Sequence, residues 1–252
     1  GSSSVDDTKN IFTRSVFVTS LDANTKQASS TISWATDQRT QTVTLVTRLT
    51  KWSSPATGGC TAGPLTGNWA LPQLLGTADL GAGNEGTDVV VKLPYVFVSG
   101  IASSANKPDI FVFNVTNLAS PSLVASLNIG SGGINALFLK GNYLYAASSN
   151  DTKELIIFNI TNPASIAEVA SLNLSGTEDA IAIHGTGDVV YVGRKESAGA
   201  ELMVVNISNP LIPSVTTSLE TIDDVNDIYS TGDNLYIVSE ESNNDVRVYD
   251  IT

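Results

Sequence analysis

The chain has 252 residues, of which 42% are hydrophobic and only 15% are charged, so it can bury a sizeable core and is not disordered as a whole. It carries 13 Lys and Arg against 25 Asp and Glu, and the net charge of −12 repels phosphate backbones, which argues against nucleic acid as a partner. One His and one Cys leave too few ligands for a zinc site or an iron–sulfur cluster.

Three candidate strands open the chain, at residues 12–19, 26–34 and 42–52. One ends in Ser33-Trp34 and the next in Leu49-Thr50-Lys51-Trp52, and this order resembles the β-region of type IV minor pilins and pseudopilins. In that family a hydrophobic N-terminal helix anchors the subunit in the membrane or the filament, and this sequence lacks such a helix. The alternative is a generic three-stranded meander packed against the following domain.

A small-residue segment with several Gly and Pro, residues 53–70, follows these strands and predicts a linker. The charge also changes here. Residues 1–70 carry six basic and four acidic side chains, whereas the rest of the chain is strongly acidic. We therefore expect a β module over residues 1–52, a linker over 53–70 and a second domain over 71–252.

The second domain consists of four similar segments. Matching positions at the end of an apolar strand are Asn114, Asn159, Asn206 and Asp250, which lie 45, 47 and 44 residues apart. A period near 45 in a β-rich chain is typical of propeller blades. Each repeat predicts four strands, and in the second repeat these cover residues 136–139, 143–147, 155–160 and 166–172. Turn pairs separate the first two strands of the later repeats: Gly141-Asn142, Gly187-Asp188 and Asp233-Asn234.

The fourth repeat stops after its third strand, at residues 246–251. Residues 71–78, which precede the first repeat, resemble the fourth strand of that repeat at residues 121–127. We expect this N-terminal strand to complete the last blade and close the ring, because closure removes both open sheet edges. The predicted fold is thus all-β: a four-bladed β-propeller closed by an N-terminal strand, preceded by a small antiparallel β module. The alternative is that the repeats belong to a longer, truncated propeller.

The segments 159–163 (Asn-Ile-Thr-Asn-Pro) and 206–210 (Asn-Ile-Ser-Asn-Pro), each after an apolar strand, resemble the Asp-Val-Ser-Asn-Pro punctuation of the LVIVD repeat family. That resemblance covers residues 71–252 and implies a propeller of a bacterial or archaeal surface protein. It implies nothing about activity. The sequence departs from the family by carrying Asn at three positions where the family often has Asp.

One oxygen-bearing side chain begins the inner strand of each repeat: Asp88, Asn135, Asp179 and Asn226. If the first strands line the axis, these four side chains converge at one mouth of the channel, and such a ring can bind Ca²⁺ weakly. The alternative is that these residues cap the loops that enter the strands. Two acidic loop clusters are expected to form a solvated face: Asp223, Asp224 and Asp227, and Glu240, Glu241 and Asp245.

Three further features are expected to be structural or incidental. The Asn-x-Ser/Thr sequons at Asn114, Asn159 and Asn206 belong to the strand-end turn of the repeat, so glycosylation is not needed to explain them. His184 is expected at a surface turn and not as a catalytic base. Cys60 is expected to be an incidental thiol in a Gly-rich segment.

The sequence favours a non-enzymatic recognition or adhesion module on a bacterial cell surface, with a propeller head displayed on a pilin-like base. Expected partners are a surface protein or glycan, or other pilin-like subunits. No cofactor is expected, with weak Ca²⁺ binding left open, and membrane contact is expected only through a helix that this sequence lacks. Two alternatives remain: a hydrolase or lyase that uses the axial carboxylates Asp88, Asp179 and Asp227, and a purely structural filament subunit.

Overall fold

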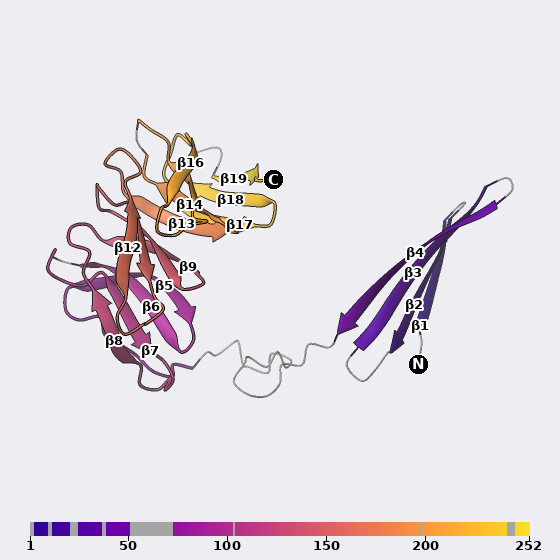
Figure 1. Ribbon diagram of the computed structural model, residues 1–252, viewed down its shortest axis with the longest axis horizontal. Coiled ribbons are helices and arrows are strands. Elements are labelled where there is room, and N and C mark those ends of the chain that lie inside the picture. The colour runs from indigo at the N-terminus through magenta and orange to yellow at the C-terminus, as the bar shows by residue number, and fades with distance from the viewer. Residues whose placement is uncertain are drawn as a thin grey trace. The chain divides into compact units, whose positions relative to one another are not determined.

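A computed structural model of the chain describes residues 3–9, 12–20, 25–36, 39–50, 73–102, 104–196, 198–240 and 245–252. The chain forms two compact units, Gly1–Pro72 and Gln73–Thr252. In the described ranges every helix or strand element is a β-strand, as expected, and none is a helix that could cross a membrane (Figure 1). The predicted linker over residues 53–70, and with it Cys60, lies outside the described residues.

The first unit is a four-stranded antiparallel meander in the order β1-β2-β3-β4. Its strands are β1 (Ser3–Lys9), β2 (Phe12–Ser20), β3 (Thr25–Thr36) and β4 (Arg39–Thr50). The expectation of three strands was therefore wrong by one, because β1 pairs with β2 from Ser3 opposite Val18 to Lys9 opposite Phe12. Its Asp-containing sequence has low strand propensity, and the pairing with β2 overrides that propensity.

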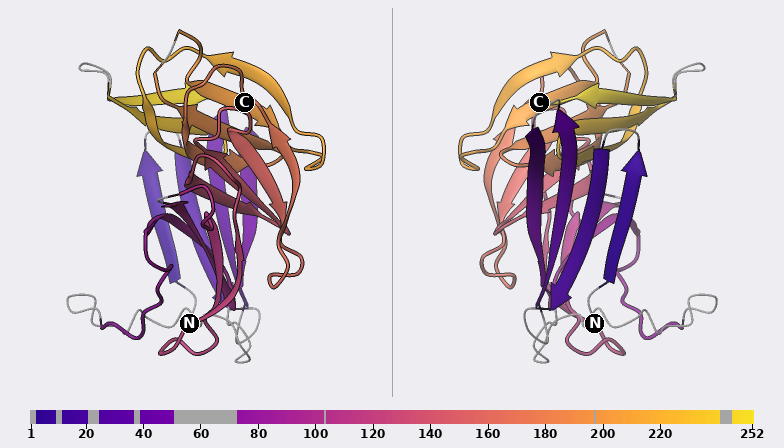
Figure 2. Two further views of the ribbon diagram at one scale, coloured as in Figure 1. Left: turned by 90° about the vertical axis from the view of Figure 1, so that its left-hand side faces the viewer. Right: turned by 90° about the vertical axis from the view of Figure 1, so that its right-hand side faces the viewer.

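The second unit contains four antiparallel sheets, which we call blades 1 to 4 in chain order (Figures 1 and 2). Blade 1 consists of β5 (Asn84–Lys92), β6 (Tyr95–Ala102), β7 (Ile110–Asn114) and β8 (Ser122–Leu127). Blade 2 consists of β9 (Ile134–Lys140), β10 (Tyr143–Ser148), β11 (Leu155–Asn159) and β12 (Ala167–Leu172). Blade 3 consists of β13 (Ala180–Thr186), β14 (Val189–Arg194), β15 (Leu202–Asn206) and β16 (Ser214–Leu219). Blade 4 has three strands, β17 (Val225–Thr231), β18 (Asn234–Ser239) and β19 (Val246–Asp250).

Local sequence explains where the strands end. Tight turns join the first two strands of blades 2, 3 and 4, and each begins with a glycine whose φ is positive: Gly141, Gly187 and Gly232. The turn of blade 4 is therefore Gly232-Asp233, one residue before the predicted pair. At the end of each third strand, the Oδ1 atom of Asn114, Asn159, Asn206 or Asp250 accepts a hydrogen bond from the backbone N–H two residues later, at 2.8–3.0 Å. The repeated sequons thus form the expected turns.

The core lies between consecutive blades. The inner strands are β5, β9, β13 and β17, and each of the first three contacts the next one along the chain. Apolar clusters fill the spaces between blades 1 and 2 (around Leu144), between blades 2 and 3 (around Leu155) and between blades 3 and 4 (around Leu235). Because both of their faces are covered, β10 and β11 read as continuous apolar runs, as the sequence predicted.

The predicted closure of the ring is wrong. Residues 73–80 form no strand, and no strand of blade 4 pairs with them. They lie instead against blade 1, where Ala78 and Leu80 line a hollow with Val96, Val98 and Phe113. The apolar pattern of residues 71–78 predicted a strand of the last blade, but such a pattern specifies neither strand pairing nor which sheet the segment contacts. Within the described ranges, no strand of blade 4 pairs with a strand of blade 1, and the main contacts run from blade 1 to 2, from 2 to 3 and from 3 to 4.

Candidate functional site

The four residues predicted as an axial ring do not share one register position. Each inner strand carries a β-bulge, and the bulged residues are Thr87, Asn135, Ile181 and Asn226. Asp88 therefore lies one residue beyond the bulge and Asp179 lies two residues before it. The spacing of the four predicted residues along the sequence could not reveal this offset, because the number of residues between successive bulges differs from blade to blade.

The side chains at this end of the inner strands bond across the blades. Asp88 Oδ2 accepts a hydrogen bond from Leu137 N of blade 2 at 2.7 Å, and Oδ1 accepts one from Val89 N at 2.6 Å. Asn135 Nδ2 donates to Ala180 O of blade 3 at 2.7 Å. These contacts give Asp88 and Asn135 a structural role between blades, which differs from the capping of the entering loops considered in the sequence analysis.

Asp179 and Asn226 have local partners. Asp179 Oδ2 lies 2.6 Å from Lys195 Nζ, and this hydrogen bond raises the pKa of Lys195. Asn226 Nδ2 donates to Glu240 Oε1 at 3.2 Å. Among the described residues, no group of three or more His, Cys, Asp and Glu is placed to hold a metal ion. Ca²⁺ binding by the four predicted residues stays a prediction.

His184 was expected at a surface turn, but it lies within β13. Its ring lies between Phe138 of β9 and Tyr229 of β17, with centroid separations of 5.5 and 4.7 Å. Nδ1 accepts a hydrogen bond from Ser230 N at 3.1 Å, so this nitrogen carries no proton. Burial lowers the pKa of His184, and the charge of Asp227 partly offsets this effect. The imidazole of blade 3 therefore contacts both neighbouring blades, through Phe138 of blade 2 and through Tyr229 and Ser230 of blade 4.

A buried acid precedes the third strand in three of the blades. The residues are Asp109, Glu154 and Glu201, and each accepts a hydrogen bond from a backbone N–H that follows the fourth strand: Ile129 N, Leu174 N and Thr221 N at 2.8–2.9 Å. Burial raises the pKa of Asp109, and the bond from Ile129 opposes the rise. These carboxylates fix the connection to the next blade.

Arg194, at the end of β14, departs from the repeat. The matching positions in the other blades hold Gly100, Ser148 and Ser239, and all four positions are buried. An arginine at a position that is otherwise small and buried needs partners for its charge. This difference between the repeats is visible in the sequence, but the site prediction considered only acidic and Asn residues and therefore did not include Arg194.

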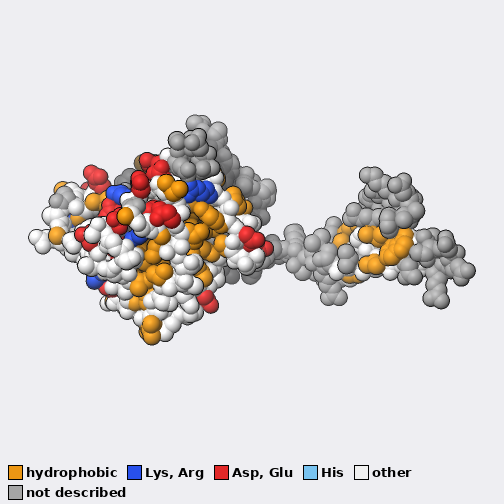
Figure 3. All heavy atoms as spheres, turned by 90° about the horizontal axis from the view of Figure 1, so that it is seen from above, with side chains coloured by type: hydrophobic (Ala, Val, Ile, Leu, Met, Phe, Trp, Pro, Cys, Tyr) orange, Lys and Arg blue, Asp and Glu red, His pale blue; other side chains and the backbone are white. Residues whose placement is uncertain are grey.

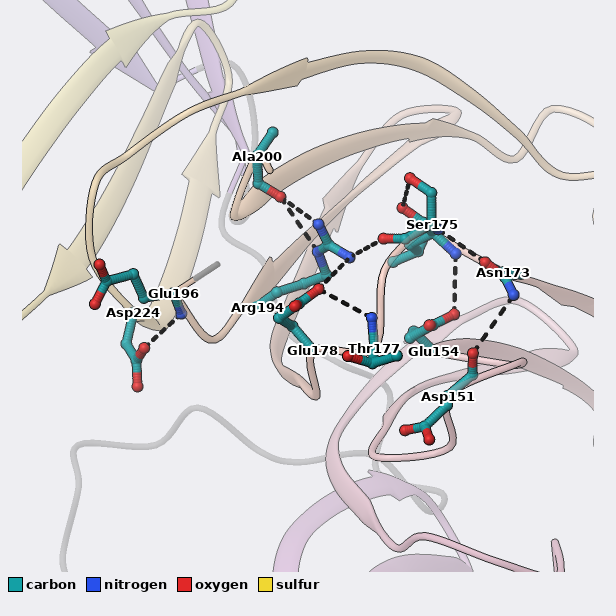
Figure 4. Close-up of polar contacts among 11 residues, drawn as sticks. Asp151, Glu154, Asn173, Ser175, Thr177, Glu178, Arg194, Glu196, Ala200 and Asp224 are labelled. Atoms are coloured by element: carbon teal, nitrogen blue, oxygen red, sulfur yellow. Dashed lines mark hydrogen bonds and ion pairs between the residues drawn. The ribbon is translucent and has the colours of Figure 1, made fainter. Parts of the chain in front are cut away.

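The arginine finds its partners in two loops (Figure 4). Nε and Nη2 donate to Ala200 O at 3.2 and 2.6 Å, and Nη1 donates to Ser175 O at 2.6 Å. Nη1 also lies 3.9 Å from Glu178 Oε2, which accepts a hydrogen bond from Thr177 N at 3.0 Å. Gly176, with φ of 95°, leaves room for this carboxylate, since a Cβ there would overlap it.

A hollow of about 250 Å³ opens beside this pair. Its wall consists of Arg194, residues 175, 176 and 178 of the β12–β13 connection, residues 198–200 of the β14–β15 connection, and Met203 and Ser218. The guanidinium has five N–H groups, and among the described residues the bonds given above use only three of them. The hollow thus presents N–H donors and a carboxylate acceptor beside the apolar side chains of Ala198, Ala200 and Met203.

An acidic side chain also joins two of the neighbouring loops. Asp224 Oδ1 accepts a hydrogen bond from Glu196 N at 2.6 Å, which ties the β14–β15 connection to the β16–β17 connection. Of the predicted clusters, Asp223 and Asp224 precede β17, Glu240 follows β18 and Asp245 precedes β19, but Asp227 lies within β17 and not in a loop. Glu241 lies outside the described residues.

The comparisons with known proteins agree with this architecture. Residues 89–250 match the family described as Beta propeller domain, which is more than half of the chain. The chain belongs to this propeller family. The curated proteins that were searched gave no match.

Two solved structures resemble the propeller. A functionally unknown protein from Desulfotomaculum acetoxidans DSM 771 is 11% identical, with a TM-score of 0.53 over 94% of this chain and 72% of that chain. BamB from Moraxella catarrhalis is 14% identical, with a TM-score of 0.44 over 92% of this chain and 55% of that chain. At 11% identity, the first likeness shows a common fold and not a common activity.

Proposed function

We propose that the propeller is a non-enzymatic recognition module and that the hollow beside Arg194 binds a sugar ring of a surface glycan. The observation that carries this proposal is a buried guanidinium that lies next to the Glu178 carboxylate and, within the described ranges, donates hydrogen bonds through three of its five N–H groups. Neighbouring sugar hydroxyls both accept and donate hydrogen bonds, so they complement a donor and an acceptor that lie side by side. A peptide is the alternative ligand.

The size and charge of the site support a small neutral ligand. A hollow of about 250 Å³ is below the usual range of about 300–1,000 Å³ for sites that enclose drug-sized ligands, so it suits one sugar ring of a chain that continues into solvent. The net charge of −12 disfavours polyanionic glycans. The apolar side chain of Met203 offers a surface for the C–H face of the ring.

The hydrogen bonds of the axial acids favour binding over catalysis. Both oxygens of Asp88 accept backbone hydrogen bonds, and Asp179 pairs with Lys195. Both side chains are thus held by contacts within the protein, which favours a structural role for them over contact with a substrate.

We further propose that the module is displayed at a bacterial cell surface, with the β1–β4 unit as a pilin-like base. Two resemblances support this: the Asn-x-Thr/Ser-Asn-Pro punctuation resembles LVIVD repeats of surface proteins, and residues 12–52 resemble the β-region of minor pilins. Filament association then places the propeller where it meets glycans of other cells. Sequencing the gene upstream tests this part, because a pilin-like parent must encode a hydrophobic helix ahead of these residues.

Glycan-array binding of the labelled protein tests the recognition function. Glu178→Gln retains the size of the side chain but removes its charge, and we expect it to weaken binding to any glycan hit by about tenfold, the loss of one charge-assisted hydrogen bond. Glu168→Gln is the matched control, because Glu168 pairs with Lys153 on blade 2, away from the hollow. Failure to bind any glycan, or equal binding by both variants, contradicts the proposal.

A further inference from the structure

Blades 1 to 3 each carry a pair of polar residues just outside their last two strands. The first residue of the third strand lies opposite the last residue of the fourth strand in all three blades. The two residues next to this pair therefore also face each other. They are Asp109 and Asn128 in blade 1, Glu154 and Asn173 in blade 2, and Glu201 and Glu220 in blade 3. A buried acid thus faces an amide in two blades and a second acid in the third.

The amides of blades 1 and 2 each make two contacts. The Oδ1 atoms of Asn128 and Asn173 accept hydrogen bonds from the backbone N–H two residues later, at 2.6 and 2.8 Å. Their Nδ2 atoms donate to the connection between the second and third strands of the same blade, at Ala105 O (2.8 Å) and Asp151 O (3.5 Å). An amide does not titrate, so these contacts do not depend on pH.

Glu220 of blade 3 makes the first of these contacts but not the second. Its Oε1 accepts a hydrogen bond from Ile222 N at 3.3 Å. A carboxyl group has no N–H to donate, and the side chain of Glu220 forms a hydrogen bond with that of Glu201 instead. A hydrogen bond between two carboxyl groups requires a proton on one of them. Glu201 is fully buried and accepts from Thr221 N at 2.8 Å, so the exposed Glu220 is the group that exchanges this proton with solvent.

The groups around Glu220 favour its protonated form. The hydrogen bond with Glu201 raises the pKa of Glu220, the charges of Glu201 and Glu196 add to this rise, and the bond from Ile222 N opposes it. Figure 3 shows further acidic side chains on the propeller surface, and the negative field of a chain with net charge −12 also favours a bound proton. The other charged residues of the elements that meet here are Asp223 and Asp224 of the β16–β17 connection and Arg247 of β19, which donates to Thr221 O at 2.7 Å.

This pair of acids adjoins the wall of the hollow. Glu201 directly follows Ala200, whose carbonyl oxygen accepts two hydrogen bonds from the buried guanidinium, and Glu220 lies two residues after Ser218. Ala200 and Ser218 both line the hollow. Beyond the pair, Ile222 has a φ of 71°, which is costly for a β-branched residue, so the segment depends on its hydrogen bonds to hold this conformation. Loss of the bond between the two acids therefore loosens one side of the hollow.

We propose that Glu201 and Glu220 form a pH-dependent latch beside the hollow, closed by a shared proton in mildly acidic solution and released as the pH rises. When Glu220 gives up its proton to solvent, two carboxylates lie opposite each other, and like charges in this arrangement are destabilising. The exposed Glu220 side chain then turns into solvent. The hollow binds its sugar less tightly in this released state, a consequence that rests on the proposed function, whereas the latch itself does not.

Amide hydrogen exchange measured by mass spectrometry at about pH 5 and about pH 7.5, corrected for the intrinsic exchange rates, tests the latch without a ligand. In the parent chain, the protection of residues 199–203 and 218–222 is expected to be about fivefold lower at the higher pH, which corresponds to one ordinary hydrogen bond. Glu220→Gln keeps an acceptor for Ile222 N and an N–H donor at both pH values, so its protection is expected to stay constant. Glu168→Gln is the matched control and is expected to behave as the parent, because Glu168 pairs with Lys153 on blade 2.

Asn173→Glu transfers the pair of acids to blade 2, since it places a second carboxyl group opposite Glu154. Exchange at residues 153–156 and 171–174 is then expected to become pH-dependent. Equal protection of the parent at both pH values, the same fall in Glu220→Gln, or no new pH dependence in Asn173→Glu overturns the latch. A glycan hit that the parent binds equally at both pH values overturns its control of the hollow. An array without any hit contradicts the proposed function instead, and the exchange measurement still decides the latch.

Discussion

Replacement of Asp88 by Ala removes the carboxylate that links blades 1 and 2. Two hydrogen bonds are lost, from Leu137 N at 2.7 Å and from Val89 N at 2.6 Å. Charge-assisted hydrogen bonds contribute about 1.5–3 kcal/mol each, and solvent can satisfy part of the loss because Asp88 is half-buried, so we expect the free energy of unfolding to fall by about 2–3 kcal/mol. In a unit of this size, that corresponds to about 4–12 °C in Tm.

Differential scanning calorimetry measures this shift in the propeller transition. Asp151→Ala is the matched control, because the exposed Asp151 side chain has no hydrogen-bond partner among the described residues. The scan is repeated with added Ca²⁺, since a cation held by Asp88, Asn135, Asp179 and Asn226 would raise the Tm of the parent and not that of the variant. A Tm for Asp88→Ala equal to that of the control would refute the role of this residue as a link between blades.

Three further changes test other parts of the propeller. Gly193→Ala places a Cβ 2.6 Å from Val225 Cγ1, so overpacking between blades 3 and 4 is expected to cost about 1–3 kcal/mol in urea unfolding; an unchanged midpoint contradicts it. Glu154→Ala leaves a buried backbone N–H without its acceptor and is expected to cost about 1–3 kcal/mol, whereas Glu154→Gln keeps an acceptor and costs less; equal losses would show that the acceptor is unimportant. Burial lowers the pKa of His184 in the folded protein, so as the pH falls His184 is protonated at a higher pH in the unfolded chain than in the folded one. The free energy of unfolding is therefore expected to decrease as the pH drops below 6.5. His184→Asn keeps an acceptor for Ser230 N and should lack the pH dependence due to His184 when unfolding curves at about pH 7.5 and about pH 5.5 are compared. The same pH dependence in the parent and the variant would contradict this role of His184.

The periodicity of the sequence predicted the blades well, because it reports burial and turn chemistry directly. In the second repeat, the four expected strands fall on β9 to β12 within two residues. The repeated Asn at strand ends was equally informative, since each one forms its turn through its own neighbours. Such local features depend on few residues and leave a clear pattern in one repeat after another.

Features that depend on distant contacts were not predictable in the same way. The bulges shift Asp179 away from the position of Asn135, and bulges leave no residue signature of their own here. The apolar pattern of residues 71–78 predicted a fourth strand for blade 4, whereas residues 73–80 form no strand and lie against blade 1. Arg194 was overlooked because its meaning emerges only from alignment with the small residues Gly100 and Ser148.

The contacts between neighbouring blades have a consequence for how such a chain can change over evolutionary time. Thr87 and Asn135 donate to main-chain carbonyls of the following sheet, and Asp88 accepts from a main-chain amide. Main-chain groups are the same in every repeat, so these links require no co-adapted side chain on the receiving strand. Units of about 45 residues can therefore be duplicated, deleted or reordered in the gene while these hydrogen bonds between neighbouring blades are retained. The loops can change independently of these bonds.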